Sequence, residues 1–124
     1  ASLVDGDNFT LPTGHQFWFD VTGAYTPAGG YDATNIRMNV SGATTAESVA
    51  AIVKTAINAS ASTTKGITTD AAGKLLLAET VAGSAKNGAI VEAVANAGFL
   101  VQGMYGGLDA DAFSAVIAIP SYLG

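Results

Sequence analysis

The fold is decided by residues 35–59, NIRMNVSGATTAESVAAIVKTAINA, which contain a strand pattern, a short break and a helix pattern. Apolar Ile36, Met38 and Val40 alternate with polar residues, which is the period of a strand with one buried face. Further along, apolar residues recur three and four positions apart. The stretch therefore predicts a strand followed by one amphipathic helix over about residues 44–58.

The start of this helix is predicted by Thr44 and Glu47, whose spacing of three is that of a capping box. In such a box each side chain accepts a hydrogen bond from the other residue's backbone N–H. The residues expected on the buried face of the helix are Val49, Ile52, Val53, Ala56 and Ile57. A helix with a single apolar stripe needs a sheet to cover, and the rest of the chain supplies strands.

Short segments on both sides of the helix alternate apolar and polar residues and are separated by turn residues, which predicts two hairpins and two further strands. The expected strands are residues 9–11 with 16–21, 67–69 with 74–79, 89–94 and 99–102. A short helix over residues 90–97 is the alternative to the strand at 89–94.

These elements predict an α+β fold, in which a mostly antiparallel sheet of about five to seven strands is packed by the one helix. Residues 1–107 are expected to form a compact β-β-β-α-β-β domain. Residues 108–124 are expected to be a C-terminal arm or an extra strand that makes assembly contacts. The apolar run within this tail, residues 112–119, needs an edge strand to pair with, either in its own chain or in a neighbour.

The composition indicates a surface that is poorly suited to a solitary monomer. Only 12% of the residues are charged, against about 25% in typical soluble domains, while 49% are hydrophobic and 15 of 124 are glycine. Such a chain is expected to be covered by copies of itself or by other subunits. The alternative is a soluble, alanine-rich monomer.

Charge and cysteine content exclude several function classes. The net charge is −5 and Arg37 is the one arginine, so no basic cluster is available to bind nucleic-acid phosphates. There is no cysteine to form disulfides or thiolate metal sites. No apolar run reaches the roughly 20 residues of a membrane helix, so no membrane partner is expected.

The residues that carry chemistry are too few and too scattered to predict a reaction. His15 is the one histidine, and it lies in a turn without a second metal ligand nearby. Two acidic pairs, at residues 5 and 7 and at 109 and 111, lack the remainder of a calcium-binding loop and are interpreted as solvated turn residues. We therefore predict no catalytic, cofactor or metal site, and no enzymatic activity.

Aromatic residues in unusual positions indicate an assembly interface. Trp18 lies on the nominally polar face of its strand, where it is expected to pack beneath a loop or a neighbouring subunit. Residues 22–35 form a long loop, which is either a partner contact or a floppy surface loop. The predicted interface residues are Trp18, Tyr25, Tyr31, Met104, Tyr105, Phe113, Val116, Ile117 and Ile119.

The order of the motifs resembles a small α+β domain found in structural proteins of tailed bacteriophages. The resemblance rests on an aromatic strand at residues 17–19, a helix that ends in AINA at 56–59, the segment AGKLLL at 72–77 and the turn GMYGG at 103–107. It covers about residues 5–107 and brings no catalytic residues with it.

The resemblance implies a non-enzymatic virion protein that self-assembles or binds a lattice, made in the host cytoplasm and located in the virion. A capsid decoration protein is the first expectation. A tail-tube or other tail subunit is the close alternative, followed by a fibre or an adhesive binding module. The expected partners are copies of the chain itself and other virion proteins, such as major capsid or tail proteins, without sequence-specific contacts to nucleic acid.

Overall fold

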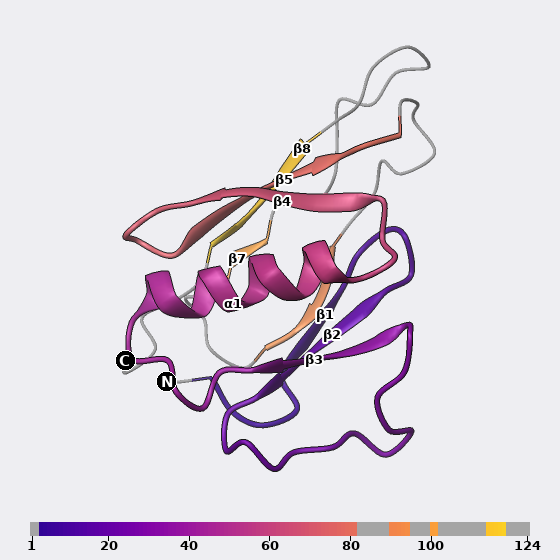
Figure 1. The fold of residues 1–124 in the computed structure, drawn as a ribbon, viewed down its shortest axis with the longest axis vertical. Coiled ribbons are helices and arrows are strands. Elements are labelled where there is room, and N and C mark those ends of the chain that lie inside the picture. The colour runs from indigo at the N-terminus through magenta and orange to yellow at the C-terminus, as the bar shows by residue number, and fades with distance from the viewer. Residues whose placement is uncertain (1–2, 82–89, 95–99, 102–113, 119–124) are drawn as a thin grey trace.

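The computed structural model describes residues 3–81, 90–94, 100–101 and 114–118, and every structural statement below concerns these residues. They form one helix and eight strands, and the strands lie in two four-stranded sheets (Figure 1). The α+β fold expected from the sequence, built mostly of strand, is thereby confirmed. Five of the six strand pairings are antiparallel.

The first sheet has the order β3-β2-β1-β6. Its strands are β1 (Asn8–Thr10), β2 (Gln16–Asp20), β3 (Asn35–Asn39) and β6 (Val91–Ala93). The predicted hairpin of β1 and β2 is confirmed, but β3 runs parallel to β2. The connection between these two strands, residues 21–34, is long enough for the chain to cross back to the start of β2, which a tight turn does not allow.

The second sheet has the order β4-β5-β8-β7, with all pairings antiparallel. Its strands are β4 (Thr64–Thr69), β5 (Lys74–Glu79), β7 (Leu100–Val101) and β8 (Ser114–Ala118). Strand β8 lies between β5 and β7, so this part of the C-terminal tail is an extra strand paired within its own chain. Strand β4 starts three residues earlier than predicted. A bulge between Gly66 and Thr68 interrupts the alternation of side chains, so the sequence pattern did not reveal the first residues of the strand.

Helix α1 (Ala46–Ala59) begins one residue later than a capping box at Thr44 and Glu47 would place it, so that prediction is wrong. The N-cap is Thr45, whose Oγ1 accepts a hydrogen bond from the Ser48 N–H at 3.1 Å, while the Ser48 Oγ accepts one from the Thr45 N–H at 3.1 Å. Two adjacent threonines allow both registers, and a serine hydroxyl can take the place of the expected carboxylate. Glu47 lies in the first helical turn, where the helix dipole favours an acid.

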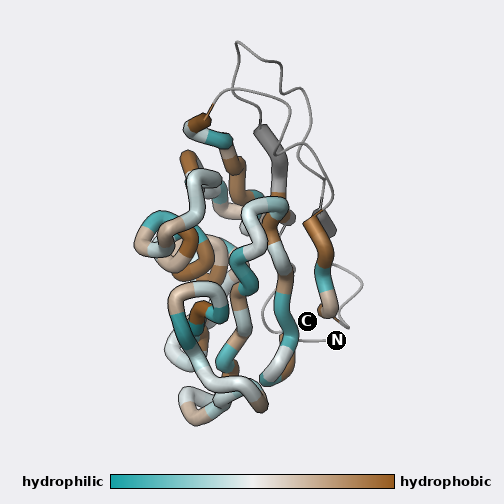
Figure 2. Tube along the Cα trace, turned by 90° about the vertical axis from the view of Figure 1, so that its right-hand side faces the viewer, coloured by the Kyte–Doolittle hydropathy of each residue, from teal (hydrophilic) through white to brown (hydrophobic). Residues whose placement is uncertain are grey.

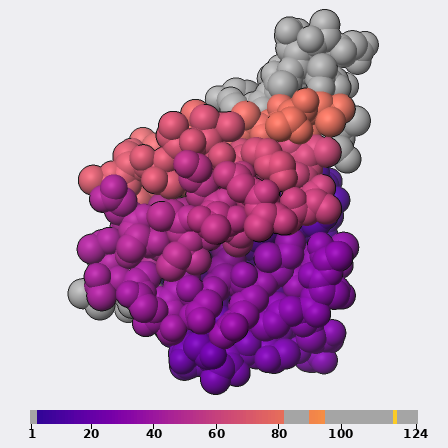
Figure 3. Space-filling model, viewed as in Figure 1, coloured from indigo at the N-terminus to yellow at the C-terminus, as the bar shows by residue number. Residues whose placement is uncertain are grey.

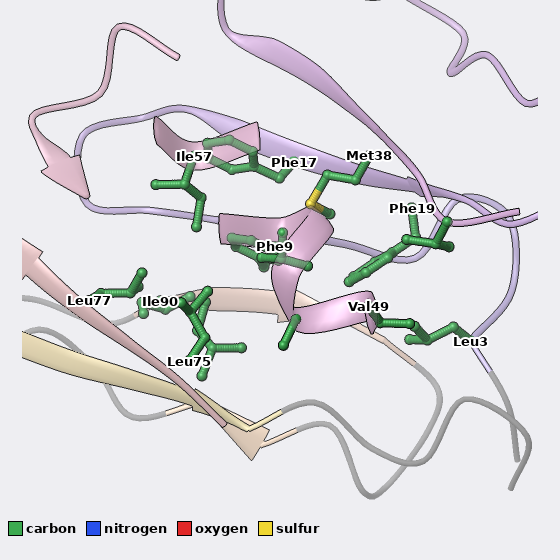
Figure 4. Close-up of a cluster of buried hydrophobic side chains, with 14 of the residues drawn as sticks. Leu3, Phe9, Phe17, Phe19, Met38, Val49, Ile57, Leu75, Leu77 and Ile90 are labelled. Carbon is green, nitrogen blue, oxygen red and sulfur yellow. The ribbon is translucent and has the colours of Figure 1, made fainter. Parts of the chain in front are cut away.

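The core lies between the two sheets and α1 (Figure 4). Phe9, Phe17 and Phe19 are fully buried, and the rings of Phe9 and Phe17 stack with their centroids 5.2 Å apart. The second sheet contributes Leu75, Leu77 and Ile117, and α1 contributes Val49, Ala50, Val53 and Ile57. Of the predicted helix face, Ile52 and Ala56 are only partly buried, because the helix is rotated to bury Ala50 in their place.

Helix α1 lies between the edge strand β3 of the first sheet and the edge strand β4 of the second (Figure 1). In the view of Figure 2 this helix carries both hydrophilic and hydrophobic residues. Since α1 has an edge strand on each flank, the way it meets each one decides which surface remains open to a partner.

Candidate docking surface

The flank of α1 toward β4 is closed by tight packing. A Cβ atom added at Gly66 of β4 would lie 2.8 Å from Cγ and 3.4 Å from Cα of Lys54, so the helix approaches the strand as closely as a glycine permits. The Asn58 side chain donates to the Gly66 carbonyl at 3.1 Å and accepts from the Gly66 N–H at 2.8 Å. The outward backbone groups of the β4 edge at this point are therefore already satisfied by the helix.

The flank of α1 toward β3 is open and forms a groove. Two adjoining cavities of about 330 and 370 Å³ share Arg37, Ala56 and Ala59 in their linings. The helix side of the first cavity consists of small or aliphatic residues, Ala51, Ile52, Thr55, Ala56 and Ala59. Figure 3 shows the face of the molecule that carries α1 and β3. Short side chains on a helix allow another backbone to come close to it.

The floor of this groove is the free edge of β3. The Gln16 N–H donates to the Thr34 carbonyl, and the Val40 N–H donates to the Asp20 carbonyl. Because alternate residues of a strand direct their backbone groups to opposite sides, the even-numbered residues of β3 face β2. Arg37 and Asn39 consequently point their N–H and C=O groups away from the sheet, and within the described part of the chain nothing bonds them there.

One end of the groove carries a carboxylate. The Oδ1 atom of Asp32 accepts hydrogen bonds from the N–H of Thr34 at 2.8 Å and of Asn35 at 2.7 Å, and from both of their side chains. These hydrogen bonds lower the pKa of Asp32 to about 2, and the bond from the Thr34 N–H has the largest effect. The Asp32 N–H also donates to the Asn35 carbonyl at 2.9 Å, which closes the first residue of the β3 edge. Asp32 is therefore ionised at physiological pH.

Among the described residues, Arg37 is the one cation that lines the groove, and it is already paired. Arg37 donates through Nε to Asp20 Oδ2 at 2.7 Å and through Nη2 to the Gly23 carbonyl at 2.8 Å. Burial of the Asp20 carboxyl raises its pKa, but bonds from the Tyr25 N–H, Arg37 and the Gly23 N–H lower it by more, so the net shift is downward. The groove is thus close to neutral along β3 and negative at its Asp32 end.

Three of the predicted aromatic interface residues lie in the described part of the chain, Trp18 on β2 and Tyr25 and Tyr31 on the long loop that follows it. Trp18 donates from its indole N–H to Asn35 Oδ1 at 3.2 Å, and its ring lies 6.4 Å from that of Tyr25. Tyr31 donates its hydroxyl to the Tyr25 carbonyl at 2.9 Å, and burial, followed by the Asp20 charge, raises its pKa. All three aromatic residues are partly buried in their own chain. Trp18 thus lies beside loop residues of its own chain.

This loop is anchored by two aspartates. Asp5 Oδ1 accepts hydrogen bonds from the N–H groups of Val21 at 2.6 Å and Thr22 at 3.0 Å, and its Oδ2 accepts the Thr22 hydroxyl at 2.7 Å. These hydrogen bonds lower the pKa of Asp5, although burial of the carboxyl raises it. The bond from the Thr22 hydroxyl has the largest effect, ahead of the two backbone bonds. Asp20 holds the next turn through the N–H groups of Gly23 and Tyr25. These bonds tie the start of the loop, residues 21–25, to Asp5 and Asp20.

The remaining predicted interface residues fall into three groups. Ile117 is fully buried in the core of its own chain, so its side chain offers no surface to a partner, and its assignment to the interface is wrong. Val116 lies opposite Leu76 in the β5–β8 register. Met104, Tyr105, Phe113 and Ile119 lie outside the described residues.

His15 lies next to the first hairpin turn, as expected, and its Nδ1 is 3.0 Å from the Thr13 hydroxyl. That hydroxyl is 2.9 Å from the buried Ser62 hydroxyl, so the three side chains join the hairpin turn to the chain that leaves α1.

The groove itself was missed by sequence reasoning, which assigned Ile52 and Ala56 to the buried face. The repeat of Ala51, Thr55 and Ala59 at a spacing of four is the signal that could have revealed it.

Comparison with known proteins finds no matching family model, no matching curated protein and no matching solved structure. Among the described residues, no three or more His, Cys, Asp or Glu side chains come together in a way that could hold a metal ion. Within the same residues, no helix has the length and apolar character to cross a membrane.

Proposed function

We propose that this chain is a non-enzymatic structural subunit of a bacteriophage virion, and in the first place a capsid decoration protein. The observation that carries the proposal is the open edge of β3 beside the groove of α1, because an exposed sheet edge next to an apolar wall is a surface for another polypeptide. The low charge content and the motif order quoted above support the same proposal. The partners are copies of the chain and other virion proteins.

A fibre or adhesive module is the second candidate, and the aromatic cluster favours it. Trp18 and Tyr25 lie close together, and the amide residues Asn8, Gln16 and Asn35 occupy strand positions around Trp18. Aromatic rings next to amides are a common means of binding sugars. In this case the chain would bind a glycan through the outer face of the first sheet, and the α1–β3 groove would not be needed.

Purified particles test the proposal directly. We expect mass spectrometry with isotope-labelled standards to find the chain on virions at a fixed copy number in proportion to the major capsid protein. A ratio that matches the tail subunits, or rings and tubes of the purified chain in the electron microscope, would favour the tail alternative. Absence from washed particles, together with glycan binding that Trp18→Ala abolishes, would replace the proposal with the adhesive module.

A further inference from the structure

We propose that the α1–β3 groove binds an extended segment of a partner chain that is uncharged except for a Lys or Arg at one end. The segment adds a strand to β3 and places this cation over Asp32. This inference deepens the proposed function, on which it rests, by naming the kind of segment that the partner supplies. It depends on the free edge of β3, the small side chains of α1 and the charge at the end of the groove.

The backbone of β3 supplies the binding contacts. Arg37 and Asn39 present two N–H and two C=O groups outward, so an added strand can form up to four ladder hydrogen bonds. Asn35 is not available, because Asp32 already bonds both of its outward groups. The added strand is therefore centred on residues 37–39, beside the cavity that these residues line.

The groove determines which side chains the added strand carries. In a continued sheet, every second side chain lies on the same face as buried Met38, which is the face that α1 covers. On that face the wall is formed by Ala51, Ile52 and Ala56 and carries no charge. Apolar residues of moderate size, such as Val or Ile, fit this wall, whereas a charged side chain would lose its hydration there without gaining a partner.

The charge of Asp32 determines which kind of residue the bound segment carries at its end. Asp32 binds its four donors through Oδ1, and no described residue bonds Oδ2. The partial negative charge at the nearby carboxyl end of α1 is already balanced by Lys65, which donates to the carbonyls of Asn58 and Ser60. Asp32 therefore carries the uncompensated charge at this end of the groove. A Lys or Arg complements it, and an acidic residue is repelled.

A second copy of the same chain is the competing occupant. If the β3 edges of two copies paired, each groove would receive the sequence NIRMN of the other copy, whose arginine is already committed to Asp20. The paired strand of such a second copy brings no free cation to Asp32. The charge at the groove end therefore favours a different partner.

The test uses immobilised hexapeptide libraries and the full-length protein. Five positions are varied among Val, Ile, Thr, Ser and Ala, and Lys is fixed at either end, since the direction of the added strand is open. Matched libraries carry Glu in place of Lys. We expect binders from the Lys libraries, with at least fivefold weaker binding by their Glu counterparts.

The protein variant Asn39→Pro removes one outward N–H without breaking a bond to β2, since edge strands tolerate proline where the N–H faces away from the sheet. Its control is Asn39→Ala, which loses the same side-chain bonds to Ser41 but keeps that N–H. We expect Asn39→Pro to bind a selected peptide about fivefold more weakly than Asn39→Ala, in line with the loss of one net hydrogen bond. If Asn39→Pro does not fold, Ala59→Arg blocks the groove where its two cavities adjoin, with Ala71→Arg in the β4–β5 turn as its control.

Three outcomes would overturn the inference: no binder in any library, equal binding by the two Asn39 variants, or equal binding of the Lys and Glu peptides. A dimer that Asn39→Pro disrupts in light scattering would identify the second copy as the occupant. If peptides fail but the chain is still found on virions, only the inference falls. If peptides bind as expected and virions lack the chain, only the virion role falls.

Discussion

The two flanks of α1 differ although one helix forms both. On the β4 side, Gly66 lets the helix backbone approach and Asn58 bonds the strand edge. On the β3 side, the helix presents Ala51, Thr55 and Ala59 to a cavity, and the strand edge has outward groups without a bonding partner in the described residues. Proteins usually cover or blunt their exposed edges. The contrast therefore marks β3 as an edge kept free for binding.

The core under the helix should depend strongly on Ile57 and weakly on Ile52, although the sequence pattern assigns both isoleucines to the buried face of the helix. Ile57 is fully buried and Ile52 lies in the groove wall. We expect Ile57→Ala to cost about 2–5 kcal/mol of unfolding free energy and Ile52→Ala about 1 kcal/mol. Urea unfolding of both variants measures the difference. Equal losses would show that the open flank is packed as tightly as the core.

Gly66→Ala tests the closed flank by adding a single methyl group. The new Cβ would meet Lys54 near its backbone, where the side chain cannot simply swing away. We expect a loss of about 1–3 kcal/mol, because a well-packed contact must be pushed apart. The matched change on the open flank, Ala59→Val, adds bulk to an exposed position and should cost under about 1 kcal/mol. Thermal melts of the two variants would contradict the contrast if they shifted by the same amount.

Asn58→Ala and Asn39→Ala compare the two edges through the same substitution. Asn58 bonds both backbone groups of Gly66, whereas Asn39 bonds only Ser41 in its own turn. We expect Asn58→Ala to cost about 1–2 kcal/mol and Asn39→Ala about 0.5 kcal/mol. Hydrogen exchange of the Gly66 amide, read by NMR, should accelerate only in Asn58→Ala. An unchanged Gly66 amide would mean that this bond does not hold the β4 edge.

The sequence predicted those parts of the fold that local patterns determine. The second hairpin follows from alternation around a turn in which Gly73 has a φ of +80° and the Asp70 side chain accepts from the Lys74 N–H. The parallel pairing of β3 with β2 was not predictable in this way. It depends on the path of the loop, which is fixed by contacts of Asp5 and Asp20 with residues distant in sequence or spread along the loop.

The groove was harder to predict than the fold, for a physical reason. Periodicity identifies the apolar stripe of α1 but not its rotation. In the structure Ala50 is fully buried, Ile52 is only partly buried in the groove wall, and Lys54 packs against Gly66 on the other flank. In the same way, the apolar tail was expected to need an edge strand, but its position between β5 and β7 depends on long-range pairing. Local sequence therefore indicates which surfaces are apolar, and packing decides which of them stay open.

The smallest expected effect concerns acid sensitivity at the Asp32 end of the open flank. Its folded pKa of about 2 lies below the ordinary value of 3.8, so the ionised carboxylate stabilises the folded state above about pH 4. This contribution is lost as the pH falls from about 4 toward 2. We expect the urea midpoint of Asp32→Asn to fall less steeply over this range than that of the wild type. Thr34→Val, which removes one of the four donors to Asp32 and keeps its backbone N–H, should lie between them. Parallel acid profiles for all three proteins would mean that the hydrogen bonds to the Asp32 carboxylate do not contribute to folding stability. The charge of Asp32 would then act only on a bound segment.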